Sequence, residues 1–297
     1  TVQWQITENG LLDSLNGVTI ANLDASTATP EIIVGDFVFD AAGSQVLTLP
    51  VNDEAIPLVE DVDLDGVYEY VARTGVYDGA GNLEYGYDAT QARFPAVGNL
   101  DDDLEAELIF CGGNRLIRVD LDLVNNTAAI TWNVAFPGGG GGAPTIGDFD
   151  GDGEPEIGAA GLANYAVFEA DGTVRWTRPT IDASSASTGS TLADFDNDGR
   201  VEVVYRDEQF LYVYDGGDGT VLLQELNRSG TVREYPIVVD VDADNQAEIV
   251  VVGGPSLGVN YVTAYGSASG GWVPTRKTWN QHAYSVTNVE DGSEGSG

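Results

Sequence analysis

PTIGDFDGDGEPEIGAAG, residues 144–161, places a short acidic run between two apolar stretches. The run itself, DFDGDGEPE at 148–156, carries Asp at its positions 1, 3 and 5 and Glu at position 9. Four other runs repeat this spacing: DVDLDGVYE (61–69), NLDDDLEAE (99–107), DFDNDGRVE (194–202) and DVDADNQAE (240–248). The flanks have the composition of β-strands, so the repeated unit is an acidic loop that joins two strands.

This spacing suits a tight loop around a hard cation, with side-chain oxygens at positions 1, 3, 5 and 9 and a backbone carbonyl at position 7. Ca²⁺ takes roughly six to eight oxygen ligands in flexible geometry, so it is the expected occupant. An EF-hand loop differs, because its last acid comes at about position 12 and helices flank it. The alternative is a set of acidic β-turns without metal, but five copies in register favour metal.

We therefore predict about five calcium ions. The predicted side-chain ligands are Asp61, Asp63, Asp65, Glu69, Asn99, Asp101, Asp103, Glu107, Asp148, Asp150, Asp152, Glu156, Asp194, Asp196, Asp198, Glu202, Asp240, Asp242, Asp244 and Glu248.

Two of the five runs depart from the commonest pattern, and a degenerate copy precedes them. The run at 99 has Asn99 at position 1 and Leu104 where Gly is usual, which weakens its geometry. The run at 240 has Asn245 at that place, and Asn tolerates positive φ better than most residues. Asn22 and Asp24 open a copy that is one residue too long, and metal binding there stays open.

The repeat defines the architecture. The loops start at 22, 61, 99, 148, 194 and 240, with a partial copy at 288, and each repeat contains four short strand-like runs separated by turns. Four strands in a repeat of this size describe a β-propeller blade. We predict an all-β propeller of four-stranded blades that spans residues 1–290 as one domain, followed by a flexible Gly/Ser tail or linker at 291–297.

The ends of the chain predict how the ring closes. Residues 1–24 align without a gap on residues 173–196, so the chain begins on a fourth strand and ends on a first strand near 285–289. Six full blades lie between, and the termini together supply part of a seventh. Two outcomes stay open: closure within one chain, which removes free sheet edges, or strand exchange between chains that gives a homo-oligomer or filament.

The composition excludes several partners. With 48 acidic and 12 basic residues the net charge is −36, so nucleic acid and anionic membranes are poor partners. Cys111 is the single cysteine, and we expect a buried structural thiol. The chain contains no methionine, so we expect a processed protein or a piece of a longer one; it shows no membrane span. Weakly binding calcium loops fill best outside the cell, which predicts an extracellular or cell-surface location.

The chain resembles the FG-GAP (integrin-α-like, VCBS-type) repeats of calcium-binding β-propellers. Gly142-Ala143-Pro144 before the acidic run spells the GAP element, and TWNQHAYSVTNVEDG near the C-terminus is similar to a segment of large prokaryotic surface proteins with these repeats. The resemblance implies calcium between the first two strands of a blade and a mostly adhesive or structural role; a few members bind or cleave polysaccharides. The carbonyl ligands that it implies are those of Val67, Glu105, Glu154, Arg200 and Gln246.

Catalytic patterns are weak. His282 is the only histidine and is expected to be packed among aromatic residues, and almost all of the paired carboxylates that glycoside chemistry would need belong to the loops. The run PGGGGGAP at 137–144 lacks the lysine of a phosphate loop and is interpreted as a flexible connection. We therefore expect no enzyme.

The competing interpretation is a carbohydrate-binding module or a calcium-assisted polysaccharide lyase, with a protein or glycan ligand on one face of the propeller. Its candidate residues are the aromatic Tyr85, Tyr87, Tyr212 and Tyr214 and the potentially catalytic Arg73, Tyr205 and Arg206. Trp132, Trp176 and Trp272 recur with the repeat on its fourth strand, so we expect packing between blades rather than a ligand-binding set.

Overall fold

The computed structural model describes residues 5, 17–23, 29–51, 58–101, 103–231, 235–254, 256 and 261–275. Within these residues every regular element is a β-strand, and the strands form six antiparallel sheets of consecutive strands. Blade 1 contains β1 (Val18–Ala21), β2 (Glu31–Val34), β3 (Phe37–Phe39) and β4 (Gln45–Thr48). Blade 2 contains β5 (Leu58–Glu60), β6 (Glu69–Ala72), β7 (Gly75–Tyr77) and β8 (Leu83–Gly86). Blade 3 contains β9 (Phe94–Gly98), β10 (Glu107–Gly112), β11 (Arg115–Asp122) and β12 (Thr127–Ala135).

The second half of the chain repeats the pattern. Blade 4 contains β13 (Thr145–Gly147), β14 (Glu156–Ala160), β15 (Asn164–Phe168) and β16 (Val174–Pro179). Blade 5 contains β17 (Ser190–Ala193), β18 (Glu202–Arg206), β19 (Phe210–Tyr214) and β20 (Val221–Leu226). Blade 6 contains β21 (Ile237–Val239), β22 (Glu248–Gly253) and β23 (Tyr261–Tyr265). The predicted all-β propeller fold is thus confirmed.

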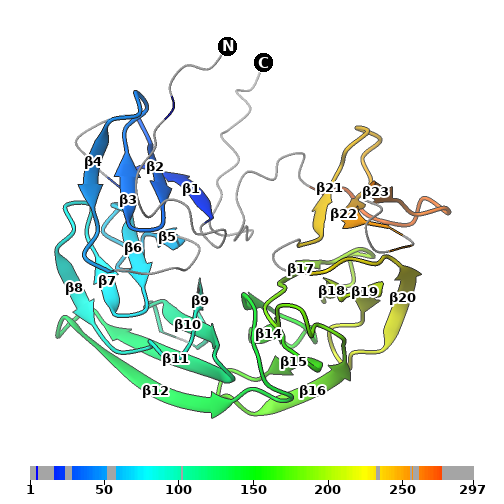
Figure 1. The fold of residues 1–297 in the computed structure, drawn as a ribbon. Helices are drawn as coiled ribbons and strands as arrows, with labels where there is room; N and C mark the ends of the chain where they lie inside the picture. Colours follow the sequence, from blue (N-terminus) through cyan, green and yellow to red (C-terminus); the bar gives the residue numbers. More distant parts are fainter. Residues whose placement is uncertain are drawn as a thin grey trace.

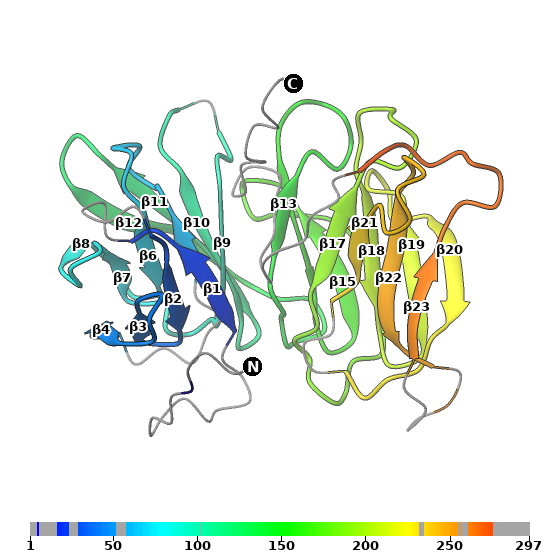
Figure 2. The same cartoon turned by 90° about the horizontal axis from the view of Figure 1, so that it is seen from above.

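The blades are arranged around a common centre (Figure 1). The first strand of each blade contacts the first strand of the next, from β1 to β5 and onward to β21, while β4, β8, β12, β16 and β20 lie on the outer rim. Viewed from above, the strands run from one face of the ring to the other (Figure 2). Because neighbouring strands are antiparallel, the loops that join the first two strands of a blade share one face with the turns before the fourth strand.

The apolar core lies between neighbouring blades. All residues of β10, β14 and β18 are buried, as expected for strands covered on both faces. Ile109 and Leu116 of blade 3, for example, form one cluster with Ile157 and Phe168 of blade 4. Fully burying side chains of this size contributes about 2 kcal/mol each, so the seams between blades carry much of the folding free energy.

The tryptophans pack at these seams, as predicted. Trp132 on β12 donates its indole N–H to the carbonyl of Ala170 in blade 4 at 3.0 Å, and Trp176 on β16 donates to Gly216 in blade 5 at 2.6 Å. A Cβ on Gly219 would lie 2.7 Å from the Trp176 ring, so only glycine fits in that turn.

Trp272 packs on Phe195 with ring centroids 4.5 Å apart, but it lies in a bend and not on a strand. The prediction of a fourth strand around Trp272 is therefore wrong for residues 266–275, and blade 6 has three strands in the described part of the chain instead of four.

The glycine run at 137–144 is not the flexible connection that the sequence predicted. The Gly142 N–H donates to Ala160 at 2.7 Å, and the Gly140 N–H donates to the Asn114 side chain at 2.7 Å. A Cβ on Gly142 would lie 2.6 Å from the Ser187 carbonyl oxygen. The glycines therefore permit close backbone packing between blades 3, 4 and 5.

Several predictions concern residues that the structure does not describe. These are the closing strands at the two termini, the tail at 291–297, Asp24 and His282. The predicted extent of the domain, residues 1–290, also stays a prediction. No helix among the described residues is long and apolar enough to cross a membrane.

Candidate metal sites

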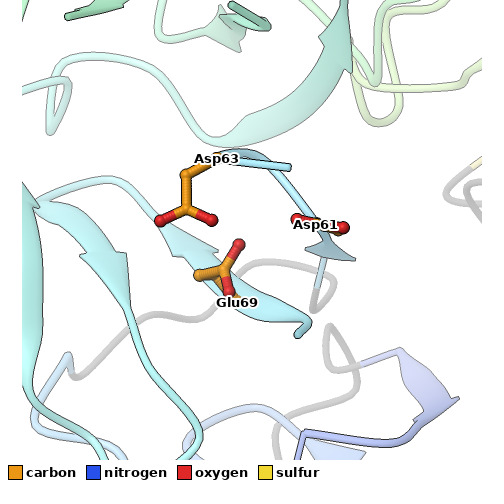
Figure 3. Close-up of side chains that lie close together, drawn as sticks. All are labelled: Asp61, Asp63 and Glu69. Carbon is orange, nitrogen blue, oxygen red and sulfur yellow. The ribbon is translucent and has the colours of Figure 1, made fainter. Parts of the chain in front are cut away.

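The five acidic loops join the first and second strands of blades 2 to 6, and each loop glutamate is the first residue of a second strand. In every loop three carboxylates offer oxygens that lie within 4.8 Å of one another. Figure 3 shows Asp61, Asp63 and Glu69 of blade 2 pointing toward a common space. The converging sets are Asp61, Asp63 and Glu69; Asp101, Asp103 and Glu107; Asp148, Asp150 and Glu156; Asp194, Asp196 and Glu202; and Asp240, Asp242 and Glu248.

The loop glutamate has a second role that the sequence did not reveal. Its Oε2 atom accepts a hydrogen bond from the backbone N–H of loop position 2. The donors are Val62 to Glu69 at 2.9 Å, Leu100 to Glu107 at 2.5 Å, Phe149 to Glu156 at 2.8 Å, Phe195 to Glu202 at 2.8 Å and Val241 to Glu248 at 3.0 Å. Blade 1 keeps this bond, since the Leu23 N–H donates to Glu31 at 3.0 Å. We call this contact the glutamate lock.

The aspartate at position 1 closes the loop from the other side. Asp148 accepts hydrogen bonds from the N–H groups of Gly151 at 2.6 Å and Gly153 at 3.0 Å. Asp194 and Asp240 make the corresponding pairs of bonds. Position 6 has positive φ in these loops, and Asn245 adopts +66° as its identity predicted.

The carboxylates at position 5 lie outside the converging sets in four of the loops. Each of them accepts the N–H of position 7, as Asp152 does from Glu154 at 2.9 Å and Asp198 from Arg200 at 2.9 Å. Ligation by position 5, by Asn99 and by the position-7 carbonyls therefore stays a prediction. It covers Asp65, Asp152, Asp198, Asp244, Asn99, Val67, Glu105, Glu154, Arg200 and Gln246.

The electrostatics of the loops favour a bound cation. Burial, followed by neighbouring carboxylates, raises the pKa of Glu69 to about 8, although the Val62 N–H opposes the shift. Burial likewise raises the pKa of Glu156 and of Glu202 to about 7. The Oδ1 atom of Asp61 is buried without a hydrogen-bond donor. A divalent cation would relieve the carboxylate repulsion and use this oxygen, so the all-oxygen donor set fits a hard metal such as calcium.

Loop position 3 is also tied to the next blade. The Tyr85 hydroxyl lies 3.4 Å from the Asp63 carboxylate and 3.4 Å from the Asn126 side chain in the turn between β11 and β12. In blade 4, Arg175 pairs with Asp150 and donates to the Gly217 carbonyl of blade 5 at 3.1 Å. The geometry of these loops is thereby coupled to the seams between blades.

The aromatic and basic residues of the competing interpretation do not form an exposed face. Tyr85 and Tyr214 are buried, while Tyr87 and Tyr212 are half-buried and pack on Phe110 and Tyr214. Tyr205 and Arg206 are fully buried, and Arg73 is half-buried. Cys111 is buried as predicted, and burial raises the pKa of its thiol.

Several solved structures share this fold. The V. cholerae biofilm matrix protein Bap1 matches with a TM-score of 0.76 and 17% identity over 92% of this chain and 72% of that chain. The exotype rhamnogalacturonan lyase YesX gives a TM-score of 0.56 and 18% identity over 88% and 57% of the two chains. Saccharomyces cerevisiae Sqt1 gives 0.56 and 10% over 87% and 74%. No family model and no curated protein matches the sequence. At these identities the likeness shows the fold alone.

Proposed function

We propose that the protein is a calcium-stabilised β-propeller of the FG-GAP type, which acts outside the cell as a structural or adhesive surface module. The observation that carries this proposal is the fivefold convergence of three carboxylate oxygens at the same place in successive blades. Such a site concentrates negative charge that the chain itself leaves largely uncompensated. Ca²⁺ would act there on folding rather than on chemistry, because it would bind the folded loop and not the unfolded chain.

The proposed surface role is supported by the fold likeness to a biofilm matrix protein and by the net charge of the chain. Bap1, which shares the fold at a TM-score of 0.76, is a biofilm matrix protein. The net charge of −36 suits a protein that meets abundant cations and no nucleic acid. Assembly into an oligomer or filament through the termini stays a prediction, because the residues concerned are outside the described part of the chain.

Calcium titration of the metal-free protein by calorimetry tests the first half of the proposal. Asp196→Ala, in a converging set of blade 5, should remove one binding site and leave the others intact. Asp218→Ala is the matched control, because Asp218 lies in an exposed turn of the same blade and its carboxylate accepts the Thr220 N–H at 2.7 Å. A protein that takes up no calcium, or loses none through Asp196→Ala, would contradict the proposal.

A second candidate function is recognition or cleavage of a polysaccharide, since YesX shares the fold. A glycan array and a uronate-lyase assay in the presence of calcium separate the two candidates. Specific binding or turnover would favour the second, and silence in both assays would support the structural module. The burial of Tyr85, Tyr214, Tyr205 and Arg206 counts against the groups that this candidate would use.

A further inference from the structure

One acidic loop already has a cation beside it. In each blade the second and third strands pair residue by residue, so equivalent positions can be compared between blades. The position of interest lies on the third strand, opposite the residue that comes two places after the lock glutamate on the second strand. Five blades carry a small apolar residue there: Val38, Val76, Val167, Val213 and Ala264. Blade 3 carries Arg118, which pairs with Ile109.

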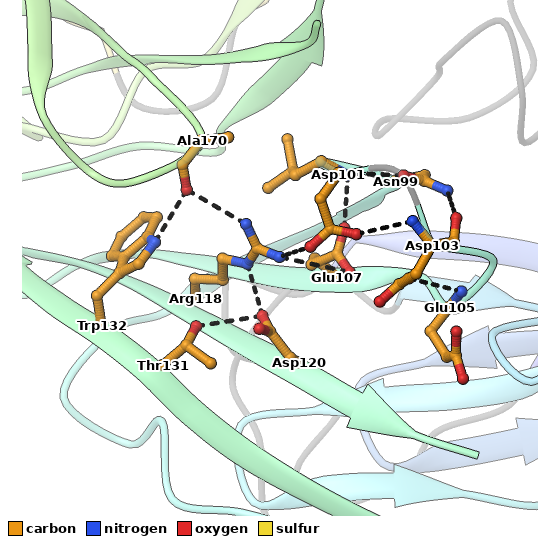
Figure 4. Close-up of polar contacts among 11 residues, drawn as sticks. Asn99, Asp101, Asp103, Glu105, Glu107, Arg118, Asp120, Thr131, Trp132 and Ala170 are labelled. Carbon is orange, nitrogen blue, oxygen red and sulfur yellow. Dashed lines mark hydrogen bonds and ion pairs between the residues drawn. The ribbon is translucent and has the colours of Figure 1, made fainter. Parts of the chain in front are cut away.

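The Arg118 guanidinium reaches into the carboxylates of the Asn99–Glu107 loop (Figure 4). Its Nη2 atom lies 2.5 Å from Asp101 Oδ2 and 3.6 Å from Glu107 Oε1, which belong to two of the three converging residues. Its Nε atom lies 2.5 Å from Asp120 Oδ1 and its Nη1 donates to the Ala170 carbonyl at 3.3 Å. The Arg118 and Glu107 side chains are only 9% and 1% exposed, so little water screens the contact between them, whereas Asp101 is 43% exposed.

The rest of the same loop is also built without need of a metal. Both Asp101 oxygens are engaged, because Oδ1 accepts the Asp103 N–H at 3.1 Å while Oδ2 faces Arg118. Asn99 stands where the other four acidic loops have Asp, and its Nδ2 donates to the Asp103 carbonyl at 2.7 Å. A divalent ion would have to displace or adjoin a buried positive charge with one carboxylate fewer to hold it.

Blade 4 shares part of this arrangement, because Asp150 Oδ1 accepts the Asp152 N–H at 3.2 Å while Arg175 pairs with its Oδ2. In the described part of the chain, the converging carboxylates of blades 2, 5 and 6 form no ion pair with arginine or lysine. Arg175 of blade 4 pairs with Asp150 but forms no ion pair with Glu156, and its side chain is 26% exposed. Among the five loops, only that of blade 3 has a guanidinium between two converging carboxylates.

We propose that Arg118 takes the place of calcium in blade 3, so that the chain binds four ions at the five acidic loops. The inference rests on the proposed function, since it presumes that the remaining loops do bind calcium. It gives the blade 3 loop a permanent cation that neither chelators nor low calcium can remove.

Metal content after equilibration with calcium, measured by mass spectrometry, tests the inference. The wild-type chain should hold four ions and Arg118→Val, which installs the residue of four other blades, should hold five. Arg115→Ala is the matched control, because Arg115 lies on the same strand and contacts Asn133 instead of the loop. Five ions in the wild type would overturn the inference alone, whereas none would overturn the proposed function. A correctly folded Arg118→Val protein with four ions would also count against the inference.

A second pair of variants keeps the test decisive if Arg118→Val does not fold. Asp101→Asn should leave the ion count at four, because its loop holds none, while the analogous Asp150→Asn should reduce it to three. Thermal unfolding adds an independent readout: Asp101→Asn should lower the Tm by the same amount with and without calcium. A lost ion in Asp101→Asn, or a Tm loss that appears only with calcium, would show that the blade 3 loop binds metal and would refute the inference.

Discussion

Glu69 in blade 2 and Asp182 between blades 4 and 5 are both buried carboxylates, and the antiparallel topology places them on opposite faces of the ring. Burial would raise the pKa of Asp182, but hydrogen bonds from Thr231 at 2.5 Å, the Thr188 N–H at 3.1 Å and Ser185 at 2.8 Å lower it overall. Burial raises the pKa of Glu69 to about 8, since one backbone hydrogen bond does not offset it and neighbouring carboxylates add to the shift.

The difference teaches what a buried charge requires. On the Asp182 face the chain supplies enough donors of its own, and the carboxylate stabilises a connection between blades. On the face of the acidic loops the donors are too few, and the missing positive charge has to come from elsewhere. Blade 3 obtains it from Arg118, and we expect the other loops to obtain it from calcium.

The largest expected effect is that of chelation, which acts on one face only. At a calcium concentration about 100 times its Kd, each ion stabilises the fold by about 2.7 kcal/mol, so four ions contribute about 11 kcal/mol. At about 2 °C per kcal/mol for a chain of this size, excess EDTA should lower the Tm by about 20 °C in differential scanning calorimetry. Magnesium added back in place of calcium is the control. An unchanged Tm after verified metal removal would contradict the claim that the acidic loops, unlike Asp182, depend on a metal ion for stability.

Asp182→Ala should disturb the opposite face by a smaller amount that does not depend on metal. The substitution removes the carboxylate that accepts hydrogen bonds from the Thr231 hydroxyl and from the N–H groups of Ser187 and Thr188, at a cost of about 3 kcal/mol of unfolding free energy. Urea unfolding with calcium and with EDTA measures it. Asp171→Ala, in an exposed turn, should change stability by less than about 0.5 kcal/mol. A loss confined to the calcium-loaded protein would mean that the two faces are not independent.

In the chelated protein, the carboxylates of the two faces should make stability change with pH in opposite directions. Without metal, the folded pKa values of Glu69 at about 8 and Glu156 at about 7 lie above the ordinary value of 4.5. Their contribution to stability is complete below the unfolded pKa and is lost as pH rises through the folded pKa. The Tm of the chelated protein should therefore fall by a few degrees between about pH 5 and about pH 8.

Calcium should abolish that fall, because bound metal keeps the glutamates ionised across the range. Asp182 has the opposite sign: its lowered pKa stabilises the fold above the unfolded value and loses this effect only in acid. Scans at several pH values with and without calcium make the comparison. Parallel pH profiles in the two conditions would contradict the assignment of the raised pKa values to the loops.

The smallest expected effect tests whether the blade 2 loop depends on its contact with blade 3. Tyr85→Phe removes the hydroxyl that lies between Asp63 and Asn126, and should weaken calcium binding at blade 2 a few-fold, or by about 1 kcal/mol. Tyr87→Phe is the matched control, since its hydroxyl donates to the Ala72 carbonyl at 2.7 Å. Calorimetric titration compares the two. Equal effects of both substitutions would remove the link between Tyr85 and the metal site.

The fold and the loops were predictable because they are local patterns that recur. The positive φ of Asn245 and the second-strand start at each loop glutamate both follow from the repeat itself. The glutamate lock was not predicted, because the loop spacing indicates the glutamate only as a metal ligand and gives no sign of its hydrogen bond to the backbone. The role of the glycines at 137–144 was predicted wrongly, since close backbone approach depends on blades far apart in the sequence.

Arg118 was missed although a signal for it exists. The third strands read FVFD (37–40), GVYD (75–78), IRVD (117–120), AVFE (166–169) and YVYD (212–215), and only one of these has arginine in its second place. The sequence alone does not show that the second residues of these five segments occupy equivalent positions in their blades. The strand register shows that they are equivalent.

The glutamate lock has a consequence for how such a chain can change over generations. It recurs in all six blades, including blade 1 with its overlong loop and blade 3 with its arginine. Because the lock holds the two strands together without help from the cation, each copy can gain, lose or exchange that cation by single mutations while the neighbouring blades keep their own packing. Tandem copies of this kind can diverge one at a time, and uneven ligand sets along one chain are the expected record of that history.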